Sequence, residues 1–384
     1  MRIKRLDVLR CIAVLLVLVY HGKIVPIVDQ MGWVGVDLFF VLSGFLISGL
    51  FYSEFKRRGD VSLRRFFIRR GLKIYPAFYV MLLVTFVARQ IISLPNRPDR
   101  YLSEILFVQN YSIGVWQHTW SLGVEEHFYI LLPLLFLAMM KFSSDRKNPF
   151  QSLPWVFALI AACCLLLRAA TIYLTNPAIF ASGMVMNPTH ERIDSLTFGV
   201  FLGYLHHFHS AKIGTVFGSA RNRIAIGLLT AALLSVCVFF ARESHFLLTF
   251  GFSFIYLGFG GLLLLSLQIR DWLPSWLAAP VRILGTAFAF VGAYSYSIYL
   301  WHIPFQAFAP GVLRRLFHVE FDSIAGFWFY LIGSMVFGIL MARLIEFPIL
   351  RMRDRFFPAK QTAPVAAPVE PEIPCATALP SRGA

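Results

Sequence analysis

Apolar runs of about 20 residues recur almost to the end of this chain and constrain its fold more than any other feature. A run of that length is what an α-helix needs to cross the hydrocarbon core of a bilayer. Of the 384 residues, 58% are hydrophobic and only 14% are charged, whereas soluble domains are about 45–50% apolar and about 25% charged. The sequence therefore predicts an all-α, polytopic integral membrane protein, and it excludes a soluble domain, a disordered chain and a fibrous repeat.

Ten transmembrane helices are predicted from these runs. Polar residues enter the sixth and ninth, which are the weakest of the set. The first run follows basic residues, as in a signal peptide, but no small-residue cleavage site follows His21, so an anchored helix is expected. The predicted spans cover about residues 8–25, 33–52, 74–92, 120–140, 153–174, 192–208, 223–241, 246–267, 282–308 and 324–346.

The basic character of the chain follows from this topology. Lys and Arg number 35 against 20 Asp and Glu, for a formal net charge of +15. With the N-terminus inside, the inner segments hold more than three times as many Lys and Arg residues as the outer ones. This is the positive-inside bias of a membrane protein. We therefore expect an inner (plasma) membrane protein with both termini cytoplasmic, the lipid bilayer as a partner, and no nucleic acid.

Residues 1–357 are predicted to form a single membrane domain. Residues 358–384 are rich in Pro and Ala, cannot bury a core, and are expected to be a disordered cytoplasmic tail. The five cysteines form neither a C-x-x-C pair nor a zinc spacing, so no metal site is predicted. Any chemistry then has to lie in or at the membrane domain.

The first predicted span carries two ionisable groups on one face. Arg10 and His21 are eleven residues apart, or three turns plus about 20°, which places them on one face about 16 Å apart along the axis. Asp7 lies one turn before Arg10 and is expected to pair with it. Ionisable groups inside spans are functional candidates, and an imidazole suits proton abstraction near neutral pH. The alternative is a histidine at the outer lipid interface.

Two later spans carry further candidates. Ser295, Tyr299 and His302 stand at i, i+4 and i+7, which is one helical stripe that either lines a wet pocket or belongs to an interfacial aromatic belt. Glu125 and Glu126 point about 100° apart at a helix start, so at most one of them faces a given cavity. The helix dipole favours a carboxylate at this position, so both glutamates are explained by a structural role. The alternative is that one of them orients the imidazole of a catalytic histidine.

A dense run of basic residues precedes Pro76 on the predicted inner side. It includes Arg69, Arg70 and Lys73. Lipid headgroups are sufficient partners for such a run, but guanidinium groups also recognise phosphates bidentately, which suggests a phosphorylated cytoplasmic donor.

Other polar or small residues of the spans are given structural roles. Gly44 and Ser48, at i and i+4, are predicted to pack closely against another helix. Asp37 is expected to be solvated at the outer end of its span, and Arg168 and Glu346 to snorkel from span ends. Arg192 and Asp194, at i and i+2, do not face each other.

Taken together and in this order, these segments resemble the membrane-bound acyltransferase-3 family, over about residues 5–357. The motifs that carry the resemblance are Arg5-Leu6-Asp7-x-Leu9-Arg10 leading to His21, Gly35-Val36-Asp37-Leu38-Phe39-Phe40-Val41-Leu42-Ser43-Gly44-Phe45, the Arg-rich run closing on Pro76, Thr119-Trp120-Ser121-Leu122-x-Val124-Glu125-Glu126-x-Phe128-Tyr129, Arg192-x-Asp194-x-Leu196-x-x-Gly199, Ser295-Tyr296-x-x-Tyr299-Leu300-x-His302 and Glu346-x-Pro348.

The resemblance implies an O-acyltransferase of carbohydrates, with ten transmembrane helices. The donor would be a cytoplasmic acyl-CoA such as acetyl-CoA, used as a substrate with no tightly bound cofactor, and the acceptor a hydroxyl of an outer carbohydrate or glycolipid. The family's Arg-x10-His pair maps onto Arg10 and His21. Its Arg-x-x-Arg motif maps onto Arg70 and Lys73, where lysine departs from the pattern and Arg69 is expected to share the role.

The resulting hypothesis gives each candidate a task. His21 takes the acceptor proton or carries the acyl group transiently, and Glu125 or Glu126 orients an imidazole. Tyr299 and His302 line the transfer site, while Arg10, Arg69, Arg70 and Lys73 hold the donor. Two alternatives remain: a glycolipid or small-solute transporter with the same residues lining its passage, and a structural component of a polysaccharide assembly complex.

Overall fold

The computed structural model describes residues 4–24, 31–174, 187–268, 275–318, 320 and 322–358, and within these ranges it contains helices and no strand. The predicted all-α fold is confirmed. Apart from Pro358, the predicted tail lies outside the described residues. The long helices are α1 (Lys4–Gly22), α3 (Gly35–Arg58), α4 (Leu63–Ile91), α6 (Trp120–Phe142), α7 (Leu153–Leu174), α9 (Thr189–Phe208), α11 (Ala220–Phe239), α12 (Phe252–Gln268), α13 (Ser275–Ala293), α14 (Ser295–Phe317) and α15 (Ser323–Met341).

Shorter helical segments connect these elements. The helices α5 (Pro98–Ile105), α10 (Ser210–Gly218) and α16 (Phe347–Phe356) have no counterpart among the predicted spans. Two 3₁₀ turns, η1 (Gly32–Val34) and η2 (Gln117–Thr119), lead into α3 and α6, and two π-helical turns, η4 (Leu247–Gly251) and η6 (Ala342–Glu346), adjoin α12 and α16.

Seven segments of the described chain are long and apolar enough to cross a bilayer. The bent pair α13 and α14 adds an eighth if it is one span. The predicted first and sixth spans, α1 and α9, are helical as expected but fall outside this group because each carries several charged side chains. The structure thus shows a multi-span helical protein, and the count of ten stays a prediction. The seven are Gly32–Arg58, Leu63–Ile91, Gln117–Phe142, Leu153–Leu174, Ala220–Phe239, Leu247–Gln268 and Ser323–Phe356.

The predicted ninth span, 282–308, is not one straight helix. Its two halves, α13 and α14, meet at a bend of 64°. They have different partners, because α13 packs along α1 whereas α14 packs along α15. Gly292 is part of the reason: a β-carbon there would overlap the backbone carbonyl of Asp7 on α1. The bend is therefore set by the contacts of α13 with α1 and of α14 with α15, which a hydropathy pattern does not reveal.

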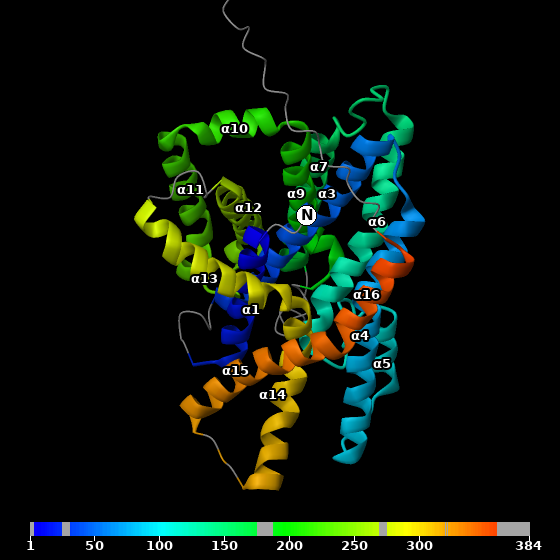
Figure 1. Ribbon diagram of the computed structural model, residues 1–384, viewed down its shortest axis with the longest axis vertical. Helices are drawn as coiled ribbons and strands as arrows, with labels where there is room; N and C mark the ends of the chain where they lie inside the picture. The colour runs from blue at the N-terminus through cyan, green and yellow to red at the C-terminus, as the bar shows by residue number, and fades with distance from the viewer. Residues whose placement is uncertain are drawn as a thin grey trace, which may run out of the picture.

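Helix α1 lies in the middle of the molecule (Figure 1), where it contacts α3, α12, α13, α14 and α15. Helix α3 is also central: 78% of the apolar window in Gly32–Arg58 is buried, against 17% in each of α7 and α11. The latter two helices therefore present most of their apolar side chains outward, as lipid-facing helices do. Arg10 and His21 accordingly stand on a helix that the protein surrounds.

Helices α3 and α9 pack backbone against backbone through small residues. A β-carbon at Gly44 would overlap the carbonyl of Leu196, and one at Gly199 would overlap the carbonyl of Val41. Ser48 lies opposite Gly203, whose missing β-carbon leaves room for the serine hydroxyl. The predicted close packing at Gly44 and Ser48 is confirmed, and it follows the rule that small residues let membrane helices approach.

Two ion pairs are buried where α3, α7, α9 and α12 meet. Arg192 donates to Asp37 at 2.7 Å and Arg168 donates to Asp194 at 2.8 Å, and each of these four side chains is at most 1% exposed. The expectations that Asp37 is solvated and that Arg168 snorkels are wrong, because each has an opposite charge on another helix. Arg192 and Asp194 indeed do not pair with each other.

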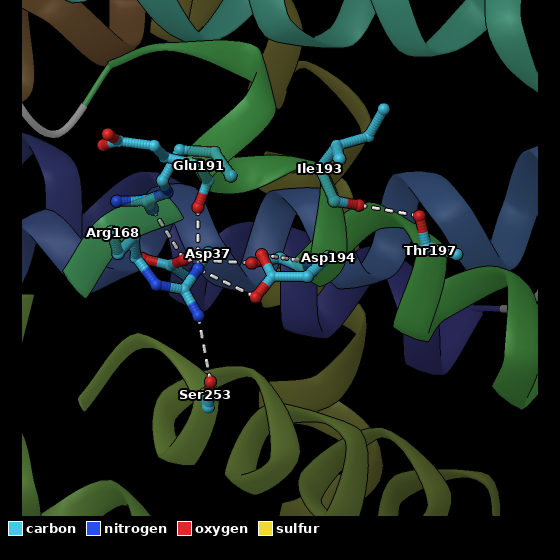
Figure 2. Close-up of polar contacts among 9 residues, drawn as sticks. Asp37, Arg168, Glu191, Ile193, Asp194, Thr197 and Ser253 are labelled. Carbon is cyan, nitrogen blue, oxygen red and sulfur yellow. Dashed lines mark hydrogen bonds and ion pairs between the residues drawn. The ribbon is translucent and has the colours of Figure 1, made fainter. Parts of the chain in front are cut away.

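Further polar groups satisfy the Arg168 guanidinium. Arg168 also donates to the Glu191 carbonyl at 2.7 Å and to the Ser253 hydroxyl at 3.0 Å (Figure 2). On the other pair, the Arg192 guanidinium carbon lies 3.8 Å from the centroid of the Phe252 ring. The network thereby joins four helices far from water, and charges in such a place persist only when they are paired and hydrogen-bonded.

Candidate active site

A cavity of about 80 Å³ lies between α1, α3, α4, α6 and α14. It brings together six of the predicted residues from four helices. Its other polar lining comes from Ser43, Ser121, Tyr296 and Glu346. The predicted residues in its wall are Arg10, Arg70, Lys73, Glu125, Ser295 and Tyr299.

The cavity wall is rich in charge. Three cations, Arg10, Arg70 and Lys73, face two carboxylates, Glu125 and Glu346. Arg10 lies 3.5 Å from Asp7, which confirms the predicted pairing within α1. Glu346 was expected to snorkel, but it is 5% exposed and accepts a hydrogen bond of 2.7 Å from Ser297. It remains inside because this buried hydroxyl partners it.

Arg70 is held by a closed triad with Glu125 and Tyr129. It donates to Glu125 at 3.3 Å and to the Tyr129 hydroxyl, which in turn donates to Glu125. The Arg70 guanidinium carbon stands 3.8 Å from the centroid of the Tyr129 ring, a cation–π contact. The Ser43 hydroxyl completes the set through a hydrogen bond with Tyr129. These contacts fix the guanidinium plane at the cavity wall.

The two adjacent glutamates diverge, as the helical geometry predicts. Glu125 faces the cavity, whereas Glu126 accepts a hydrogen bond of 3.0 Å from the Tyr75 hydroxyl. Neither hydrogen bond leads to an imidazole, so the expected orientation of a histidine by a glutamate is not found among the described residues. Arg69 does not line the cavity either. It donates to Asp354 at 3.0 Å and to the Phe357 carbonyl, beside α16.

Three imidazoles gather next to the cavity. The His21 ring lies 5.2 Å from the His302 ring, and His302 lies 4.8 Å from His118, measured between centroids. His118 and His302 are buried, and His21 is partly exposed. His21 therefore turns towards a protein neighbour on α14 rather than standing alone at a lipid interface.

Backbone carbonyls orient two of these rings. His302 Nδ1 lies 2.6 Å from the Tyr299 carbonyl, and His118 Nε2 lies 3.2 Å from the Leu300 carbonyl. A carbonyl only accepts, so each of these nitrogens carries the proton. In the neutral imidazoles the lone pairs then fall on His302 Nε2 and His118 Nδ1. Both atoms are buried without a hydrogen-bond partner among the described residues, so they are available as proton acceptors.

Tyr299 connects the cavity to the imidazole cluster. It lines the cavity, and its ring centroid lies 5.6 Å from those of both His118 and His302. Its hydroxyl donates to the His118 carbonyl at 2.7 Å, so the Ser121 hydroxyl, also at 2.7 Å, donates to Tyr299. Tyr299 is therefore the link between the cation-lined cavity and the imidazoles, none of which is itself in the cavity lining.

Sequence reasoning missed His118, Ser121 and Tyr129 as site residues. A signal was present for each, because Ser121 and Tyr129 lie within the motif that contains the glutamates, and His118 stands directly before Thr119, where that motif begins. His118 lies on η2 rather than on a long helix. No helical stripe therefore marked it.

Comparison with known proteins agrees with this geometry. The profile of a family described as an acyltransferase domain, acyltransferase-3, matches residues 3–343. The chain belongs to the acyltransferase-3 family. It thus carries an acyltransferase domain, the enzyme class that the motifs predict. The matched residues include the imidazole cluster and the whole cavity lining except Glu346. No solved structure matches the chain.

Two curated relatives are similar over most of the chain. The peptidoglycan O-acetyltransferase OatA of Listeria monocytogenes is 26% identical over 366 residues, which cover 90% of this chain and 55% of that protein. The O-acetyltransferase OatA of Staphylococcus aureus is 27% identical over 320 residues, which cover 79% of this chain and 50% of that protein. The chain spans about half the length of the curated relatives it matches.

Proposed function

We propose that this acyltransferase-3 protein moves an acyl group, acetyl in the first place, from a cytoplasmic acyl-CoA to a hydroxyl of an extracytoplasmic carbohydrate or glycolipid. One observation carries the proposal: Tyr299 joins a cation-lined cavity to a cluster of imidazoles with free lone pairs. An acyl thioester and a general base would meet there. The names of the relatives support the reaction, since both are O-acetyltransferases and one is named for peptidoglycan.

The orientation in this proposal follows the positive-inside rule. The end of the bundle with Lys56, Arg57, Arg58 and the start of α4 faces the cytoplasm, and the His21 end of α1 faces outward. Both termini are then cytoplasmic in an inner (plasma) membrane. Donor and acceptor approach from opposite sides, which suits a coenzyme that is too charged to cross the bilayer.

The donor is assigned to the cations of α1 and α4. The cavity, at about 80 Å³, is far smaller than the roughly 300–1,000 Å³ of sites that enclose a drug-sized ligand. Only the acyl end of the donor therefore enters, near Arg10 and Lys73. The phosphates stay outside, where Arg69 lies at the protein surface. Arg70, which is paired with Glu125, forms part of the cavity wall between the acyl end and the phosphates of the donor. Acyl-CoA is consumed as a substrate, and no tightly bound cofactor is expected.

The chemical step uses the imidazoles. His21 takes the proton from the acceptor hydroxyl while that oxygen attacks the thioester carbonyl, so that a C–O bond forms and the C–S bond breaks. The proton then passes to the departing thiolate, which leaves as the thiol of coenzyme A. His302 faces the His21 ring and offers its Nε2 lone pair, so it supports His21 in holding the proton. Transient acylation of His21 is the variant of this scheme with a covalent intermediate.

The test is a His21→Ala substitution in the purified, detergent-solubilised protein. With acetyl-CoA and a glycan acceptor both present, we expect loss of acetyl-CoA consumption, while expression and membrane insertion stay normal. The matched control is His245→Ala, because His245 is exposed and contacts Tyr173 instead of the imidazole cluster. Full activity of the His21→Ala variant would remove this residue from the chemistry.

The same assay separates the transporter alternative. In detergent no compartments exist and transport has no meaning, so thioester consumption by the wild-type protein indicates an enzyme. If the wild-type protein consumes no thioester with any acyl donor, that result favours the transporter hypothesis. A structural component would instead tolerate substitutions at Arg10, His21 and His302 in cells.

A further inference from the structure

A second, larger cleft of about 640 Å³ lies beside the imidazole cluster, between the end of α1, the second half of α14 and the start of α15. Its volume falls within the roughly 300–1,000 Å³ typical of small-ligand sites. The first cavity is about eight times smaller. The two hollows flank the imidazoles, because Tyr299 lines one and Gly22, next to His21, lines the other.

The cleft is physically tied to His21. Gln306 lines it and donates a hydrogen bond of 3.1 Å to the His21 carbonyl. Gln306 also stands one turn after His302 on the same helix face. On the other wall, Phe327 packs so closely on Gly22 that a β-carbon there would lie 2.6 Å from the ring. A ligand in the cleft would therefore lie against the end of α1 that carries His21, although the His21 ring itself is not part of the cleft lining.

Tyr330 carries an unused hydrogen-bonding group just behind the surface of the cleft. It lines the cleft, it is 5% exposed, and its hydroxyl is buried without a hydrogen-bond partner among the described residues. An unsatisfied buried hydroxyl costs about 1–3 kcal/mol. A ligand that hydrogen-bonds to the Tyr330 hydroxyl would remove this free-energy cost.

The lining mixes aromatic faces with polar groups. Phe327 and Tyr330 offer rings, while Gln306 offers an amide and charges of both signs are present, among them Arg314 and Asp322. A lipid chain would need a wholly apolar lining, and an anionic ligand would need an excess of cations. A sugar unit presents apolar C–H faces and many hydroxyls together, and it fits this mixture.

We propose that this cleft is the acceptor site, that it binds a sugar unit of a glycan chain, and that Tyr330 and Gln306 hold the sugar hydroxyl towards His21. The inference rests on the proposed function, because it supplies the acceptor of that reaction. The narrow cavity then takes the acyl group and the wide cleft takes the sugar. Because the two hollows share no lining residue within the described part of the chain, this arrangement requires the covalent variant of the scheme, in which His21 accepts the acyl group and passes it to the sugar hydroxyl.

The test uses the full-length protein in lipid nanodiscs with acetyl-CoA and a β-1,4-linked tetramer of N-acetylglucosamine. Gly311 lines the cleft, and a β-carbon there would meet nothing within 4 Å, so Gly311→Trp places a bulky side chain at the cleft wall without strain at its β-carbon. Gly285 on α13 is equally open but lies outside the cleft, and Gly285→Trp is the matched control. We expect Gly311→Trp to lower acetylation of the tetramer at least tenfold, with the Kd for acetyl-CoA unchanged.

A second variant tests the hydroxyl itself. Tyr330→Phe should raise the KM for the tetramer about three- to tenfold, the value of one hydrogen bond, while Tyr256→Phe, an equally buried tyrosine on α12, should not. Unchanged acetylation in Gly311→Trp, or an unchanged KM in Tyr330→Phe, overturns the cleft assignment. A wild-type protein that consumes acetyl-CoA but neither binds nor acetylates the tetramer overturns the sugar assignment. Absence of thioester consumption with the tetramer and with any other glycan acceptor supplied overturns the proposed function instead.

Discussion

Replacing Arg168 by methionine should destabilise the protein by about 3–5 kcal/mol, the cost of leaving a buried charge without its partner. The structure supports the upper part of that range. Arg168 and Asp194 are 1% and 0% exposed in their side chains, and their atoms approach to 2.8 Å. The substitution also removes the hydrogen bonds to the Glu191 carbonyl and the Ser253 hydroxyl.

The double variant Arg168→Met with Asp194→Leu should recover most of that loss. Replacing a buried ion pair with apolar residues of similar volume is often neutral or stabilising. The single variant Asp194→Leu should resemble Arg168→Met in its loss. The coupling energy of this double-mutant cycle is therefore expected to be large, well above the roughly 0.5 kcal/mol typical of independent sites.

The assay is equilibrium unfolding of the purified protein in mixed micelles, followed by loss of helical circular dichroism. The matched control is Arg97→Ala, because Arg97 and Asp99 form a pair at 3.1 Å whose side chains are 61% and 62% exposed. Exposed pairs contribute about 0–1 kcal/mol. A loss below about 1 kcal/mol in Arg168→Met would refute the reasoning, since the buried pair would then behave like the exposed one.

Three further predictions concern pH, the donor and helix packing. Burial raises the pKa of Glu104, on α5 outside the spans, from 4.5 to about 7. Because the folded state holds the Glu104 proton more tightly than the unfolded state, this carboxyl contributes up to about 3 kcal/mol to the free energy of unfolding below pH 4.5. That contribution is lost as the pH rises through 7. Glu104→Gln should flatten the pH dependence of the unfolding temperature over this window, and an unchanged slope would contradict the assignment. Phe39 lines the cavity beside Tyr299, so Phe39→Ala should enlarge the space for the acyl group. The ratio of the rate with butyryl-CoA to the rate with acetyl-CoA should then rise about tenfold or more in a coupled thiol assay. An unchanged ratio would place the acyl group elsewhere. Gly44→Val should cost about 3 kcal/mol or prevent assembly, seen as loss of the monodisperse peak in size-exclusion chromatography, whereas Gly285→Val should elute normally.

Much of the fold is predictable from the sequence because helix formation in a bilayer depends on local apolarity. Nine of the ten predicted spans each match one continuous helical segment, the ninth covers the two helices α13 and α14, and the small residues Gly44 and Ser48 correctly marked a close contact. The bend between α13 and α14 was not predictable, since it depends on which neighbours the two halves meet. Helix α9 was predicted as a span, although hydropathy gives no credit for the ion pairs that its Arg192 and Asp194 make with α3 and α7.

The site was predictable where residues repeat along one helix face and not where the chain brings separate segments together. Arg10, Tyr299 and His302 were found from spacing on their helices. Asp37 was misjudged because Arg192, which neutralises it, is 155 residues away in the chain. His118 escaped notice because a single histidine before a helix start has no periodic pattern, and only the folded chain places it against His302.

The separation of Asp37 from Arg192 also has a consequence for how the protein is made. Ribosomes add roughly 5–20 residues per second, so the 155 residues between the two side chains take roughly 8–30 s to synthesise. For that time helix α3 has left the ribosome and its acid still lacks the guanidinium that later neutralises it. An unpaired acid costs up to about 2.5–3.5 kcal/mol in a membrane helix, so the arrival of α9 removes a cost that the nascent α3 carries until then.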